Sequence, residues 1–170
     1  MKNRKSIRLK NWDYTQEGYY FITICAYQKK CVFSRIENDS IILNEWGRII
    51  QHCLLNVPEH FKHVQMDSFI IMPNHIHFIL IIGSTCRGTA CRAPTVEKFG
   101  IPITGSLPTV IRSFKSAVTK QIKELHHSPD LIIWQRNYYD HIIRNEQSLN
   151  EIRTYINNNP SQWSMDKYNL

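Results

Sequence analysis

The sequence predicts an α+β fold in which helices pack against an antiparallel sheet. Segments 19–28, 64–72 and 75–82 are rich in β-branched and aromatic residues, a composition typical of strands. Segments 42–56 and 107–125 place apolar residues at helical spacing. Strands and helices that alternate in this mixed order are expected to form one sheet covered by helices.

The first half of the chain begins with a strand over residues 19–28 (YYFITICAYQ). The neighbouring segment 31–36 (CVFSRI) is expected to pair with it across a basic turn. A helix is expected over 42–56, ending at Asn56 and Pro58. Its apolar stripe consists of Ile42, Trp46, Ile49, Ile50, Cys53 and Leu54.

The next two strands are expected to form a hairpin. Segments 64–72 and 75–82 flank Pro73 and Asn74, a pair typical of tight turns. Apart from two histidines, segment 75–82 is apolar on both of its faces. It is therefore expected to be a central strand of the sheet.

The whole chain, residues 1–170, is expected to form a single domain, because this length is typical of one. Residues 84–106, with the adjacent Gly83, hold four of the six glycines and are expected to form a long loop. The basic start MKNRKSIRLK is not followed by the apolar segment of a signal peptide. No apolar run reaches the roughly 18 residues of a membrane helix, so we expect a cytoplasmic protein without a membrane partner.

Residues 107–125 have the pattern of an amphipathic helix, with Pro108 in its first turn. The apolar stripe consists of Leu107, Ile111, Phe114, Val118, Ile122 and Leu125. The basic residues of this helix lie away from that stripe, so we expect them to face solvent.

The last strand is expected within residues 132–144, and the last helix over 148–158. Ser148 and Glu151 have the spacing of a capping box, and Pro160 is expected to end the helix. The resulting order, β-α-β-β-α-β-α, predicts a ferredoxin-like arrangement or a relative of it.

Two histidines interrupt the apolar strand 75–82. His75 and His77 are two residues apart, so their side chains project from the same face. Two imidazoles buried together are costly unless they have partners, and a divalent cation would satisfy both. Two core histidines bonded to backbone carbonyls are the alternative.

The last helix offers further polar groups in TYINNNP. Tyr155 and Asn159 are four residues apart and face the same way. An amide oxygen suits Mg²⁺ or Mn²⁺, and a tyrosine hydroxyl beside a phosphate is a candidate nucleophile. On spacing alone, a packed tyrosine and a helix-capping asparagine remain the simpler interpretation, and Tyr138 and Tyr139 are rival nucleophiles.

Lys and Arg exceed Asp and Glu by 7, with a pI of about 9.2, which favours a polyanionic partner such as nucleic acid. The basic residues on the helix 107–125 and after it are candidates to contact phosphates. They are Arg112, Lys115, Lys120, Lys123, Arg136 and Arg144. Four aromatic residues are candidates to stack on unpaired bases, with a place in the core as the alternative. They are Trp12, Tyr14, Trp134 and Tyr138.

Three segments in this order, MPNHIHFIL, WQRNYYDHIIRNEQS and YINNNP, make the sequence resemble the REP-associated tyrosine transposases. These are small members of the HUH (His-hydrophobic-His) endonuclease superfamily. The resemblance implies a variant of the ferredoxin-like fold. It also implies that His75 and His77 bind a divalent metal, Mg²⁺ or Mn²⁺, that Asn159 completes the metal site, and that Tyr155 is the nucleophile.

The resemblance further implies a metal-dependent endonuclease and strand transferase that acts on single-stranded DNA at REP-like hairpins. Attack by Tyr155 would leave a 5′-phosphotyrosine and a free 3′-OH, and the metal would polarise the scissile phosphate. A monomer or a homodimer is compatible with this activity. The alternative is a catalytically silent protein of the same fold that binds single-stranded nucleic acid.

Overall fold

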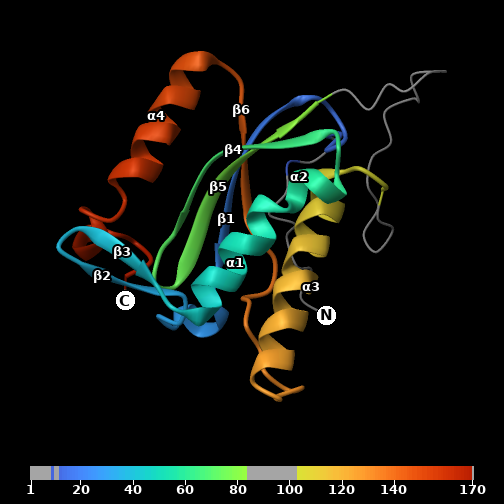
Figure 1. Cartoon of the computed structure of the whole chain (residues 1–170). Coiled ribbons are helices and arrows are strands. Elements are labelled where there is room, and N and C mark those ends of the chain that lie inside the picture. Colours follow the sequence, from blue (N-terminus) through green and yellow to red (C-terminus); the bar gives the residue numbers. More distant parts are fainter. Residues whose placement is uncertain (1–8, 10–11, 84–102, 170) are drawn as a thin grey trace, which may run out of the picture.

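A four-stranded antiparallel sheet forms the centre of the protein, as seen in a computed structural model that describes residues 9, 12–83 and 103–169 (Figure 1). In spatial order its strands are β4 (Val64–Ile71), β5 (His75–Ile82), β1 (Gly18–Cys25) and β6 (Tyr139–Ile143). With a helix after the first and after the third of these strands in the chain, this is the ferredoxin-like order. The predicted fold class is therefore confirmed.

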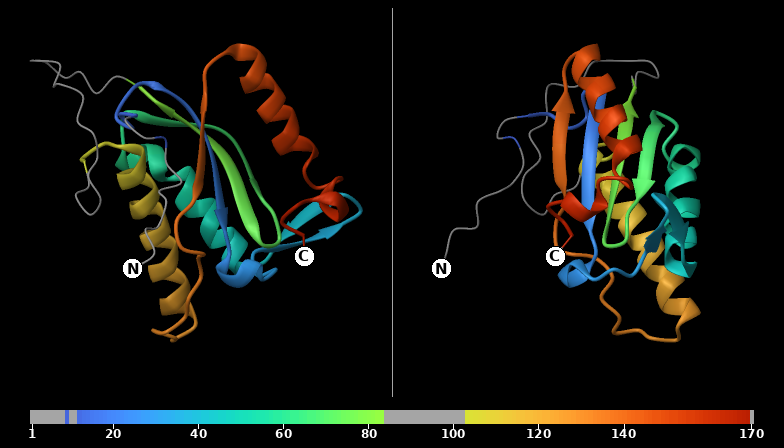
Figure 2. Two further views of the ribbon diagram at one scale, coloured as in Figure 1. Left: turned by 180° about the vertical axis from the view of Figure 1, so that it is seen from behind. Right: turned by 90° about the vertical axis from the view of Figure 1, so that its left-hand side faces the viewer.

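Helices cover both faces of the sheet (Figure 2). Helices α1 (Glu45–Leu55) and α3 (Leu107–Leu125) lie on one face, and α4 (Glu146–Asn158) lies on the other. The short helix α2 (Val57–His60) follows α1 and contains Pro58 in its first turn. Two single-turn 3₁₀ helices, η1 (Tyr27–Lys29) and η2 (Trp163–Met165), follow β1 and α4.

Strand β5 is central, as its composition predicted, and it divides the core into two parts. Its even-numbered residues, among them Ile76 and Phe78, belong to the large cluster beneath α1 and α3. On the other face Ile79 packs with Leu149 and Ile156 of α4. The two histidines therefore lie on the face that α4 covers.

A separate hairpin replaces the strand pairing expected for residues 31–36. Strands β2 (Ser34–Glu37) and β3 (Ser40–Leu43) pair with one another and not with β1, so that prediction was wrong. Asn38 and Asp39, both with positive φ, form the two-residue turn, a conformation these residue types tolerate. The helix expected over 42–56 consequently begins only at Glu45, where the Asn44 side chain accepts a hydrogen bond from the Gly47 amide.

The end of the chain differs from the prediction in two respects. The strand expected within 132–144 is limited to β6, and Trp134 forms only an isolated bridge to Ala26. Helix α4 begins earlier than expected, because the side chain of Asn145 caps it through the Ser148 amide. The capping box predicted at Ser148 was therefore wrong.

Most of the expected long loop, residues 84–102, lies outside the described residues. Residues 103–106 lead into α3, and Gly105 has a φ of 81°, which a residue with a side chain rarely adopts. Within the part of the chain that the structure describes, no helix is both long and apolar enough to cross a membrane. That residues 1–170 form one domain remains a prediction.

Candidate functional site

His75 and His77 lie side by side on β5, next to β1. The centroids of their rings are 4.5 Å apart, and the rings are inclined by 68°. Both residues are buried, with 0% and 1% of their surface exposed. The structure thus places the two imidazoles on one face, as their spacing predicted.

Hydrogen bonds around His75 leave one ring nitrogen available. The Asn74 amide nitrogen donates to the backbone oxygens of Lys29 (3.1 Å) and Tyr168 (2.6 Å), so its Oδ1 faces Nδ1 of His75 as an acceptor, at 2.8 Å. Nδ1 therefore carries the proton and Nε2 has a free lone pair. Nε2 is buried and has no hydrogen-bond partner. Such an arrangement orients a histidine as a metal ligand.

His77 is held in a comparable way. Its Nδ1 lies 2.8 Å from the Thr23 hydroxyl on β1, and its ring stacks on Phe21 at a centroid distance of 5.1 Å. Its Nε2 lies 3.3 Å from the hydroxyl of Tyr155 on α4. Burial lowers the pKa of His75 to about 4 and that of His77 well below 6.5. Both rings are consequently neutral at pH 7, which is the state that binds metals.

Helix α4 brings Tyr155 and Asn159 over the histidines. Burial raises the pKa of the Tyr155 hydroxyl, the Asp166 carboxylate raises it further, and a hydrogen bond from the Asn159 side chain opposes both. Asn159 is 2% exposed, and its Oδ1 is buried without a hydrogen-bond partner. All four residues expected at the site are therefore close together, although their roles remain predictions.

A fifth group, Asp166, reaches the site from the chain beyond α4. Its Oδ2 lies 3.9 Å from Nε2 of His75, and its side chain is 4% exposed. Ligand atoms of Asp166, His75 and His77 all lie within 4.8 Å of one another, close enough to share one metal ion. Sequence reasoning missed Asp166, because a single aspartate in SMDKYNL has no spacing signal to connect it with a strand far away.

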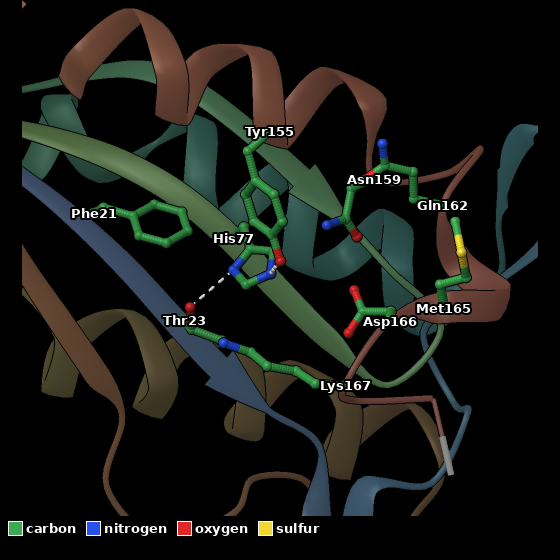
Figure 3. Close-up of a pocket in the computed structure, with 9 residues that line it drawn as sticks. All are labelled: Phe21, Thr23, His77, Tyr155, Asn159, Gln162, Met165, Asp166 and Lys167. Atoms are coloured by element: carbon green, nitrogen blue, oxygen red, sulfur yellow. Dashed lines mark hydrogen bonds between the residues drawn. The ribbon is translucent and has the colours of Figure 1, made fainter. Parts of the chain in front are cut away.

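His77, Tyr155, Asn159 and Asp166 line a cavity of about 390 Å³ between the sheet, α4 and the C-terminal segment (Figure 3). Polar side chains and the phenol of Tyr155 face the cavity, and Lys167 supplies a cation to it. The cavity brings together groups that could hold a metal ion, a tyrosine hydroxyl and a lysine, which is a combination suited to phosphoryl chemistry.

Comparisons with known proteins find relatives in sequence and in fold. No protein-family model matches the sequence. An uncharacterized protein of Haemophilus influenzae is 41% identical over 169 residues, covering 97% of this chain and 92% of the relative. A second protein of that species, which carries the name of a REP-associated tyrosine transposase, is 24% identical over 148 residues, covering 87% and 73%.

A solved structure of a REP-associated tyrosine transposase bound to a REP hairpin has the same fold. It matches with a TM-score of 0.55 and 18% identity, covering 94% of this chain and 76% of that one. The chain is thus similar in sequence to one REP-associated tyrosine transposase and in fold to another.

The six basic residues expected to contact DNA do not line the cavity. Four are exposed on the surface, namely Arg112, Lys120, Arg136 and Arg144. Lys115 instead donates to the backbone oxygens of Gln135 and Asn137, each at 3.0 Å, and burial lowers its pKa to about 8. Lys123 donates to the backbone oxygen of Pro129. Lys115 and Lys123 thus connect α3 to the segment that follows it.

The aromatic candidates separate into core and surface residues. Tyr14, Trp134 and Tyr138 are 4%, 8% and 7% exposed and belong to the core beneath α1 and α3. Trp12 is partly buried against the same core, so the core interpretation applies to all four. Tyr139 pairs with Thr23 and is 50% exposed at the sheet edge. Of the three tyrosines considered as nucleophiles, Tyr155 is the one hydrogen-bonded to a histidine of the site.

Proposed function

We propose that this protein cuts and rejoins single-stranded DNA at REP-like hairpins through a covalent link to Tyr155. The observation that carries the proposal is the distance of 3.3 Å between the Tyr155 hydroxyl and Nε2 of His77. Both residues line a cavity together with Asn159, and the His75 ring lies 4.5 Å from that of His77. The proposed substrate is supported by the shared fold with a transposase that was solved with a REP hairpin.

The residues at the site fit a divalent metal. Nε2 of His75 and the amide oxygen of Asn159 are both buried, and neither has a hydrogen-bond partner. We propose that these two residues and His77 hold Mg²⁺ or Mn²⁺, which suit a mixture of oxygen and imidazole ligands. Such a bound ion would supply Lewis-acid polarisation of the scissile phosphate.

Tyr155 performs the proposed bond exchange. Its oxygen forms a bond to the phosphorus, and the bond from phosphorus to the 3′ oxygen breaks. The phenol proton passes to water, and the departing 3′ oxygen takes up a proton, leaving a 5′-phosphotyrosine and a free 3′-OH. Attack by a 3′-OH on the phosphotyrosine reverses these changes and joins strands without ATP, because the energy of the phosphodiester is retained.

Neighbouring side chains assist this step in different ways. Burial raises the pKa of Tyr155, so the phenol is protonated at neutral pH and needs help to lose its proton. The Asn159 hydrogen bond acts in the opposite direction, since it stabilises the phenolate. Lys167 in the cavity wall is placed to attract the phosphate.

Substitution of Tyr155 by Phe tests the proposal. The change removes one oxygen and little volume, so folding and hairpin binding should persist. Cleavage of a single-stranded hairpin oligonucleotide and the covalent protein–DNA band on a denaturing gel should both disappear. Mass spectrometry of the wild-type adduct should locate the nucleotide on the peptide that contains Tyr155, and location on Tyr138 or Tyr139 would refute the assignment. DNA binding without any adduct in the wild type would favour the catalytically silent binder.

A further inference from the structure

The C-terminal segment folds back over the histidine pair. The Tyr168 backbone oxygen accepts the hydrogen bond from Asn74 described above, and the Tyr168 ring lies 4.6 Å from the His75 ring. The ring of Trp163 lies 6.1 Å from the His75 ring. These contacts fix the intervening Asp166 above His75, and the Asp166 carboxylate further accepts a hydrogen bond of 2.7 Å from the Tyr168 amide.

The Asp166 carboxylate is largely buried next to His75. Its side chain is 4% exposed, and among the described residues the basic nitrogen within 4.0 Å of it is Nε2 of His75, at 3.9 Å. This distance is longer than a hydrogen bond, and burying a carboxylate is unfavourable without a positive charge close to it.

Other electron-pair donors converge on the same point. Nε2 of His75 and Oδ1 of Asn159 are both buried without hydrogen-bond partners. In Figure 3 the amide oxygen of Asn159 and the carboxylate of Asp166 point toward one another. Buried polar atoms without hydrogen-bond partners are rare in protein interiors, and a cation bound beside the Asp166 carboxylate would satisfy both of these atoms.

We infer that Asp166 is a ligand of the metal ion and supplies the negative charge that His75, His77 and Asn159 lack. The inference rests on the proposed metal site and extends it to the C-terminal segment. The separation of 4.8 Å or less among the three ligand atoms is close to the spacing of ligands around one ion, each about 2.0–2.3 Å from it. The segment after α4 is therefore a structural part of the site.

Metal binding to the full-length protein without DNA tests this inference. Free Mn²⁺ is measured by electron paramagnetic resonance during titration of the wild type, Asp166→Asn and His75→Ala. Asp166→Asn should weaken Mn²⁺ binding at least about tenfold, because it removes the charge and preserves the shape. Asp130→Asn, the same substitution at an exposed position, is the matched control and should bind like the wild type.

The outcomes separate the inference from the function on which it rests. Unchanged Mn²⁺ affinity in Asp166→Asn, with loss of binding in His75→Ala, would overturn the role of Asp166 and leave the proposed site intact. Absence of Mn²⁺ binding by the wild type would overturn both. Asp166→Cys provides a second test if Asp166→Asn does not fold. A thiolate ligand should shift the preference from Mn²⁺ toward Cd²⁺ at least tenfold, and an unchanged preference would refute ligation.

Discussion

Asn159 contacts both parts of the proposed chemistry, which makes it informative at the scale of one residue. Its side chain hydrogen-bonds the Tyr155 hydroxyl, and its Oδ1 is free to bind a metal. We expect Asn159→Ala to reduce hairpin cleavage less than Tyr155→Phe does, because the nucleophile remains. Raising the Mg²⁺ or Mn²⁺ concentration should restore part of the cleavage rate. The part that is not restored is attributed to the lost hydrogen bond with Tyr155. A rate that does not respond to metal concentration would contradict the assignment of Asn159 as a ligand.

The two histidines should make the metal-free protein sensitive to acid. Burial lowers the pKa of His75 from 6.5 to about 4, so the unfolded chain binds the proton more strongly than the folded protein. The contribution of the two histidines to the free energy of unfolding is therefore fully present above pH 6.5. It declines as the pH falls toward 4, by about 1.4 kcal/mol per pH unit for each proton taken up on unfolding. Urea unfolding in the presence of a chelator measures this slope. His75→Gln, which cannot be protonated, should reduce it, and an equal slope in both proteins would contradict the prediction.

At the scale of the element, Gly47 shows why α1 begins where it does. A Cβ atom at this position would lie 2.2 Å from the backbone oxygen of Phe33. We expect Gly47→Ala to destabilise the protein by about 1–3 kcal/mol, despite the better helix propensity of alanine. Gly83→Ala is the control, since its Cβ would meet the His63 oxygen at 3.5 Å, an ordinary contact. The urea midpoints of the two variants are to be compared. Equal midpoints would show that the backbone at Phe33 and helix α1 can move apart without loss of stability.

The elements that the sequence predicted are those with a long and regular pattern. Strand β5 and helix α3 have the residues expected from periodicity alone, because burial on a defined face determines their composition. The β2–β3 hairpin was missed since its strands have four residues each and pack beside the main sheet. The start of α4 was misassigned because the segment NEQS contains two residues that can cap a helix, Asn145 and Ser148. Strand β6 ends at Ile143, and the helix begins soon after it with Asn145 as its cap.

The residues of the site also divide into those that regular geometry predicts and those that depend on tertiary contacts. His75 and His77 are predictable because the geometry of a strand fixes them on one face, and Tyr155 and Asn159 because helix geometry does so. That α4 lies over β5 was implied by the family resemblance and not by any periodicity. Asp166 reaches His75 only through the fold of the C-terminal segment, which is fixed by tertiary contacts such as that between Asn74 and Tyr168. Local sequence patterns contain no information on such contacts.

At the scale of the whole molecule, the basic helix and the cavity lie on opposite faces of the sheet. Helix α3 packs on the face away from the histidines, whereas α4 and the cavity lie on the other (Figure 2). Arg112 and Lys120 of α3 would therefore contact phosphates distant from the one that we propose is cut. In a hairpin substrate such phosphates would belong to the stem or to flanking strands, so α3 should affect affinity and not the chemical step.

Salt dependence of hairpin binding tests this separation. For a protein with a net charge of +7, log affinity should fall linearly with log salt, by roughly 0.7–0.9 for each phosphate neutralised. Substitution of Arg112 and Lys120 by Ala should reduce that slope by roughly one for each lost contact, and leave the cleavage rate at saturating DNA unchanged. Lys62→Ala is the control, because Lys62 pairs with Glu59 at the end of α2.

Lys115 is unsuitable for this test, since its hydrogen bonds to Gln135 and Asn137 contribute to the fold. An unchanged slope in the double variant would mean that the DNA follows another surface, and a lower cleavage rate at saturation would place α3 near the scissile phosphate.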